Sequence, residues 1–102
     1  MISVLATIEL AEGRRDDFLA AFRELVPNVL AEDGCIEYAP WIDVATEIDA
    51  QPELRTGTVV VIEKWESLEA LQSHLMAPHM MQYRKTVKSM VAGTALQILK
   101  PA

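Results

Sequence analysis

Hydrophobic and polar positions alternate in two segments of the chain. From Ile2 to Leu10 every second residue is apolar, and the same holds from Val59 to Trp65 except at Glu63. A period of two is typical of β-strands, so residues 2–10 and 58–65 are predicted strands. Both also carry apolar residues on their other face, which a sheet facing water would not need.

The period changes to that of a helix over residues 14–32. Asp33 and Gly34 follow this segment, and a glycine in this position commonly ends a helix. The apolar residues are spaced by four, three and four, which places them on one helical face: Phe18, Phe22, Leu25 and Val29.

The segments around the second predicted strand are punctuated by proline and polar residues. Residues 35–44 are predicted to form a strand, and Pro40 within it indicates an edge strand or a bulge. Residues 45–57 form a long polar loop.

The C-terminal part predicts two helices and a last strand. Ser67 is a candidate cap for a helix whose buried stripe is Leu68, Leu71 and Leu75. Pro78 separates this helix from another over roughly residues 79–91, and residues 94–100 are the last predicted strand.

The predicted order β-α-β-β-α-α-β suits one α+β domain over residues 1–102. We expect a ferredoxin-like antiparallel sheet with helices on one face. Because helices cover only one face and the strands are apolar on both, the other face needs a cover. A second copy of the sheet is the simplest cover, which predicts a homodimer of the dimeric α/β-barrel type.

Composition narrows the possible partners and location. The net charge of −6 argues against nucleic acid and against anionic membrane surfaces. The single cysteine, Cys35, forms no disulfide within the chain, and no apolar run is long enough to span a bilayer. The N-terminus lacks the basic start of a signal peptide, so a cytoplasmic location is expected. Arg84, Lys85 and Lys88 form a cationic cluster, which suits either a helix end or a rim that attracts anions.

The candidate chemistry is a cluster of residues without a common catalytic motif. With one cysteine and two histidines five positions apart, the sequence predicts no metal site. The proton-transfer candidates are His79, the slightly favoured base, then His74 and Glu63. A flat apolar ligand would contact Trp65 and the wall formed by Met76, Met80 and Tyr83.

Each of these residues also has a structural role open to it. Trp65 and the methionines are equally suited to filling the core, and Glu63 to pairing with a base across the sheet. His74 and His79 are equally suited to bonding backbone groups at helix ends.

The chain resembles the antibiotic biosynthesis monooxygenase family over nearly its whole length. The resemblance is carried by Gly34-Cys35-Ile36-x-Tyr38 and by the stretch EKWESLEALQSHLMAPHM from Glu63 to Met80. It implies a ferredoxin-like sheet paired with its twin and a cavity between sheet and helices. It also implies oxidation of phenols or quinols by O₂ without metal or flavin. The first strand has no Asn, unlike the haem-degrading relatives.

Three functions follow from these observations. The first is a cofactor-independent monooxygenase acting on a small quinol or a polyketide-like phenol. The second is a non-oxidative isomerase or cyclase of the same fold. The third is a non-catalytic dimeric module that binds a small molecule.

Overall fold

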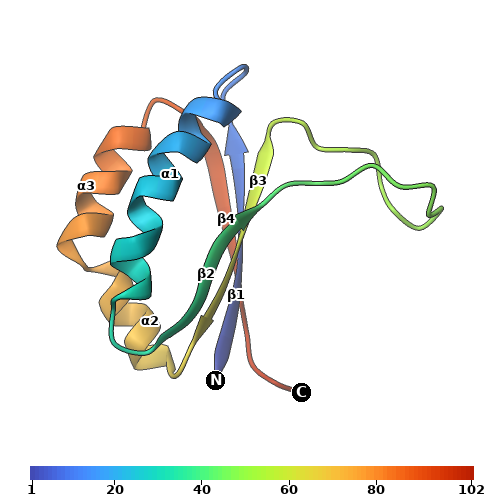
Figure 1. Ribbon diagram of the computed structural model, residues 1–102. Coiled ribbons are helices and arrows are strands. Elements are labelled where there is room, and N and C mark those ends of the chain that lie inside the picture. The colour runs from blue at the N-terminus through green and yellow to red at the C-terminus, as the bar shows by residue number, and fades with distance from the viewer.

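The computed structural model describes residues 1–102 and contains one four-stranded antiparallel sheet with three helices on one face (Figure 1). The strands lie in the order β2-β3-β1-β4, and all the pairings are antiparallel. This α+β, ferredoxin-like arrangement confirms the predicted fold class. The elements are β1 (Ile2–Leu10), α1 (Arg15–Leu30), β2 (Cys35–Trp41), β3 (Thr58–Trp65), α2 (Leu68–Leu75), α3 (Pro78–Val87) and β4 (Val91–Leu99).

The two alternating segments have the predicted bounds, whereas four other elements differ at their ends. α1 covers Arg15–Leu30, inside the expected residues 14–32. β2 ends at Trp41, α3 ends at Val87 and β4 begins at Val91 rather than at residue 94. The earlier start of β4 follows from pairing, because Val91 lies opposite Leu10 in the β1 ladder. β2 is an edge strand, as Pro40 had indicated, and its register shifts between Cys35 and Glu37, away from the proline.

The core lies between the sheet and the helices. The α1 stripe predicted from its spacing is buried, together with the helix-facing residues of β1 and β3. Leu68 is an exception, since 45% of it is exposed although it was expected in the buried stripe of α2. This short helix buries only Leu71 and His74, three positions apart.

Aromatic side chains join α1 to its neighbours. The ring of Phe22 stacks on that of Tyr38 in β2 at 5.3 Å between centroids. It also meets Tyr83 in α3 edge to face at 5.9 Å, and Phe18 lies 5.8 Å away. These contacts fix α3 against α1, and so position the junction between α2 and α3.

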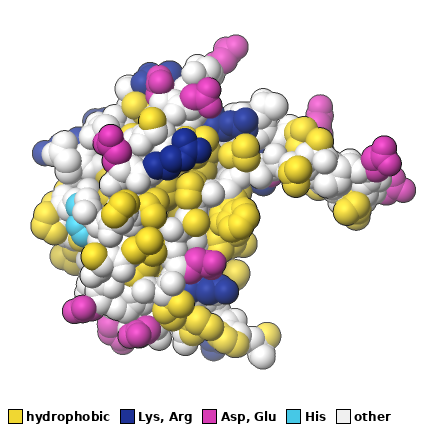
Figure 2. Space-filling view, in the orientation of Figure 1, with side chains coloured by type: hydrophobic (Ala, Val, Ile, Leu, Met, Phe, Trp, Pro, Cys, Tyr) yellow, Lys and Arg dark blue, Asp and Glu magenta, His cyan; other side chains and the backbone are white.

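A long arm over residues 42–57 extends beyond the sheet, on the side away from the helices (Figure 1). At its base, the Arg55 guanidinium donates two hydrogen bonds to Asp43, at 3.0 and 2.8 Å. Figure 2 shows hydrophobic side chains along this arm and on the adjoining body. None of the helices has the length and apolar character needed to cross a membrane.

Gly34 ends the turn after α1 in a conformation that few other residues adopt. Its φ is +83°, and its carbonyl accepts a hydrogen bond from the backbone N–H of Glu66 at 2.8 Å. A Cβ at this position would lie 2.7 Å from the Cβ of Ala70. Gly13 has a similar φ of +75° but no atom within 4 Å of such a Cβ.

We expect Gly34→Ala to destabilise the fold more than Gly13→Ala. Both substitutions incur the left-handed backbone cost of about 1–2 kcal/mol, and only Gly34→Ala adds a steric clash. Urea unfolding measures the two losses in the free energy of unfolding. Equal losses would show that the close approach to Ala70 relaxes at no cost.

Candidate active site

A cavity of about 560 Å³ lies between the sheet and the pair α2–α3. Its apolar surface includes Val4, Ala6 and Ile8 of β1 and Leu96 of β4. The carboxyl group of Glu63 and the imidazole of His74 also line the cavity, together with the cationic side chains of Arg84 and Lys88. The cavity therefore combines an apolar surface with a few ionisable groups, as small-molecule sites commonly do.

Glu63 is a buried carboxyl held by a single hydrogen bond. It is 6% exposed, and its Oε1 accepts a hydrogen bond from Trp65 Nε1–H at 2.9 Å. Burial raises the pKa of Glu63 to about 7, with a smaller contribution from the negative charge of Glu32, while the Trp65 bond opposes the rise. Glu63 therefore gains or loses its proton near neutral pH.

His74 is oriented by Glu32, a residue in the turn after α1. Its Nδ1 lies 2.8 Å from Glu32 Oε2, and the residue is 1% exposed. An ionised carboxylate only accepts hydrogen bonds, so Nδ1 carries the proton and Nε2 keeps its lone pair. Burial lowers the pKa of His74, although the bond to Glu32 acts in the opposite direction.

The Nε2 of His74 has no hydrogen-bond partner within the protein, and His74 lines the cavity. Every fully buried side-chain nitrogen or oxygen in the structure does have a hydrogen-bond partner, so Nε2 is not fully buried. Nε2 therefore touches accessible space, and the space next to His74 is the cavity that this residue lines. A lone pair in an apolar cavity is suited to accept a proton from a bound ligand.

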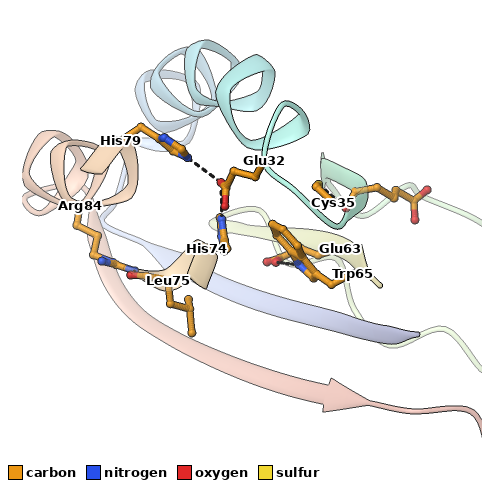
Figure 3. Close-up of polar contacts among 9 residues, drawn as sticks. Glu32, Cys35, Glu63, Trp65, His74, Leu75, His79 and Arg84 are labelled. Atoms are coloured by element: carbon orange, nitrogen blue, oxygen red, sulfur yellow. Dashed lines mark hydrogen bonds and ion pairs between the residues drawn. The ribbon is translucent and has the colours of Figure 1, made fainter. Parts of the chain in front are cut away.

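His79 occupies the other side of the same carboxylate. Its Nε2 lies 2.7 Å from Glu32 Oε2, and Figure 3 shows Glu32 between the two imidazoles. His79 does not line the main cavity but a separate depression beside Tyr83 and Gln82. The geometry therefore favours His74 over His79 as the group that meets a ligand, the reverse of the order expected from the sequence.

The predicted ligand wall is only partly assembled. Met80 and Tyr83 line the cavity, whereas Met76 is 77% exposed and does not. Trp65 is fully buried and is not among the residues that line the cavity, and its ring centroid lies 4.6 Å from that of His74. The contacts of Trp65 place it as a support for Glu63 and His74 rather than as the wall expected from the sequence.

Glu32 is the site residue that the sequence analysis missed. In the sequence Glu32 is only one of several acids near a helix end. Its partners, His74 and His79, lie 42 and 47 residues further along the chain, so no local pattern connects them. The available signal was an acid two residues before a helix-ending glycine, together with two histidines on either side of Pro78. Of the cationic cluster, Arg84 and Lys88 line the cavity and Lys85 does not, and Arg84 is anchored by a 2.7 Å hydrogen bond to the Leu75 carbonyl.

Known proteins resemble this chain in both sequence and fold. The family described as "Antibiotic biosynthesis monooxygenase" matches residues 1–86. The Escherichia coli K12 protein named "Probable quinol monooxygenase YgiN" is 39% identical over 103 residues, covering 99% of this chain and 98% of that protein.

Solved structures show the same fold at lower identity. PA3566 from Pseudomonas aeruginosa has a TM-score of 0.80 at 22% identity, covering 99% of this chain and 93% of that one. Rv0793 from Mycobacterium tuberculosis has a TM-score of 0.79 at 25% identity, covering 99% and 94%.

Ionisation of Glu63 is expected to destabilise the fold as the pH rises. Below about pH 4.5, its ordinary pKa, the carboxyl is protonated in both the folded and the unfolded chain. Between that pH and about 7 the folded chain binds more protons than the unfolded chain, so the free energy of unfolding falls with rising pH. Glu63→Gln keeps an oxygen acceptor for Trp65 and cannot ionise.

Unfolding of Glu63→Gln and of the wild-type protein should be compared from about pH 4.5 to about pH 8. The variant should gain stability relative to the wild type across this range, and the gain should level off above about pH 7. The contribution of His74 is present in both proteins and cancels in the difference. Parallel curves would contradict a raised pKa for Glu63.

Proposed function

Because this chain belongs to the antibiotic biosynthesis monooxygenase family, we propose that it oxidises a small aromatic quinol or phenol with O₂ in the cavity beside His74 and Glu63. The observation that carries the proposal is His74 itself, which lines an apolar cavity, is held at Nδ1 by Glu32 and has no hydrogen-bond partner at Nε2. The name of the E. coli relative, a quinol monooxygenase, favours this substrate class.

The cavity is suited to bind a flat aromatic ring. Its volume of about 560 Å³ falls within the usual range of small-molecule sites. Met80 is a flexible, polarisable contact for such a ring, and Tyr83 adds an aromatic one. Binding here would place a ring hydroxyl within the part of the cavity that Glu63 and His74 share.

The first chemical step is removal of a proton from that hydroxyl. His74 Nε2 accepts this proton, and the ring becomes an imidazolium. The Glu32 carboxylate, which contacts Nδ1 on the opposite side of the ring, stabilises that positive charge. Glu63 has a pKa of about 7, so it is able to donate or accept a hydrogen bond at the same substrate oxygen.

The electron-rich phenolate then reduces O₂ directly. A quinol and one O₂ give a hydroxyquinone and one water: one oxygen atom enters the ring, and the other leaves as water with two protons. The quinol supplies the four electrons. Arg84 and Lys88 at the cavity stabilise the negative charge that passes from the ring to oxygen. The proposed reaction uses neither flavin nor metal.

The proposed active protein is a homodimer paired through the sheet face that carries no helices. Leu5 and its neighbour Ile62 are half-buried on this face, and Trp41 and Leu99 are 54% and 43% exposed. Apolar area of this kind is normally covered in a folded protein. Ile42, the first residue of the arm over residues 42–57, follows Trp41 in the chain and is 49% exposed.

We predict that His74→Gln loses turnover while keeping the fold. Gln retains an amide N–H for Glu32 but accepts no proton, so kcat should fall by roughly 10²–10⁴-fold. Oxygen uptake with a dihydroquinone such as menadiol, in the presence of EDTA and without added flavin, measures the loss. His79→Gln should lose less, because His79 contacts Glu32 but does not line the cavity.

Three outcomes would contradict this function. If the wild-type protein consumes no O₂ with any quinol tested, the oxidative assignment is wrong. If ¹⁸O₂ gives labelled hydrogen peroxide and an unlabelled quinone, the protein is an oxidase and not a monooxygenase. If EDTA abolishes turnover and one metal restores it, the metal-free mechanism is wrong.

We predict a dimer in solution that depends on the open sheet face. Sedimentation at micromolar concentration should give twice the chain mass of 11.4 kDa. Ile62→Lys places a charge in the centre of the face and should shift the mass toward that of one chain. Thr86→Lys on the exposed surface of α3 is the control and should remain dimeric. A monomeric wild-type protein would contradict the pairing.

A further inference from the structure

Three side chains of the types that ligate metal ions come together beside the cavity from different parts of the fold. Glu32 lies in the turn after α1, His74 in the last turn of α2 and His79 in the first turn of α3. One ligand atom from each residue lies within 4.8 Å of the other two. We propose that these three residues form a zinc-binding site, and that zinc there inhibits the reaction by changing the proton position on His74.

The donor set matches the preference of this ion. One carboxylate oxygen and two imidazole nitrogens, with a water as the fourth ligand, form a common tetrahedral zinc set. Bonds of about 2.0–2.2 Å would place the donor atoms about 3.3 Å apart. The present separations of Glu32 Oε2 from His74 Nδ1 and His79 Nε2 are 2.8 and 2.7 Å, so they need to widen by only about half an ångström.

The site is partly rigid and partly adjustable. The backbone of Glu32 is fixed by hydrogen bonds of its N–H to the Val29 carbonyl and of its carbonyl to the Cys35 N–H. The ring of His74 packs against those of Trp65 and Tyr38, with centroid separations of 4.6 and 5.4 Å. The side chain of His79 is 28% exposed, which gives an ion a path to the site and leaves this ligand free to shift.

Charge at the site includes both favourable and opposing groups. The Glu32 carboxylate is the ligand that neutralises part of the ion's charge, and the Glu63 carboxyl is close enough for the two acids to repel. Arg84 is the opposing cation, because its charge already disfavours the charged form of His74. Replacing two N–H···O contacts by a doubly charged cation relieves the repulsion between the acids.

Zinc on Nδ1 would change what His74 presents to the cavity. A neutral imidazole holds one proton, so a metal on Nδ1 forces that proton onto Nε2. His74 would then present a donor where the proposed reaction needs an acceptor. This inhibitory effect rests on the proposed function, whereas the zinc site itself does not.

The binding test uses the purified, chelator-treated full-length protein and does not depend on turnover. Titration calorimetry with ZnCl₂ should give one ion per chain, and Co²⁺ as a probe should show the intense visible absorption of a tetrahedral complex. Glu32→Gln and His79→Gln should each weaken binding by about tenfold or more. Glu66→Gln, which removes an exposed acid from the depression beside Glu32, is the matched control and should bind zinc normally.

Circular dichroism of each variant separates loss of the site from loss of the fold. The zinc site would be overturned if the wild type and His79→Gln bound zinc with equal affinity. It would also be overturned if Glu66→Gln lost as much zinc affinity as Glu32→Gln and His79→Gln. If wild-type quinol turnover is unchanged with zinc bound, the inhibition is overturned. If turnover falls with zinc and EDTA restores it, the inhibition is supported. An absence of turnover in metal-free protein would contradict the proposed function while the calorimetry still decides the site.

Discussion

The Glu32 carboxylate, shared between two imidazoles, is the interaction on which the rest of the site depends. A single oxygen lies 2.8 Å from His74 and 2.7 Å from His79, and so connects the end of α1 to α2 and α3. The side chain of Glu32 is only 13% exposed, so these contacts act at low dielectric and are stronger than a surface pair. Removing the carboxylate would weaken the contacts of the turn after α1 with α2 and α3. It would also leave the proton of His74 free to occupy either Nδ1 or Nε2.

The apolar core gives the two cavity groups different states near neutral pH. Burial raises the pKa of Glu63 and lowers that of His74, because desolvation disfavours whichever form is charged. Trp65 contacts both groups: it packs on His74, and its hydrogen bond to Glu63 opposes part of the rise in the pKa of that carboxyl. A carboxyl that is partly protonated and an imidazole that is neutral are complementary in proton transfer.

The backbone around Glu32 explains why a short loop is able to hold such a site. Gly34 reverses the chain in the left-handed region and approaches Ala70 of α2 too closely for any side chain. Pro78 begins α3 and separates it from α2, so that His74 and His79 approach Glu32 from two helices. On one continuous helix their five-residue spacing would point them about 140° apart.

Local periodicity was enough to predict most of the fold. Residues of β1, β3 and α1 are spaced at periods of two and 3.6, and burial of one face follows from that spacing alone. Pro40 likewise indicated the edge position of β2. These features depend on neighbours in the chain, and the sequence by itself determined them.

Only the tertiary structure decided which residues meet at the site. The sequence indicated His74, His79, Glu63 and Trp65 as candidates, but it ranked His79 ahead of His74 and did not include Glu32. The Glu32 contacts span 42 and 47 residues, and no periodic pattern reports a pairing that chain folding creates. The burial of Trp65 and the exposure of Met76 were equally undetermined, because both depend on how the helices pack on the sheet.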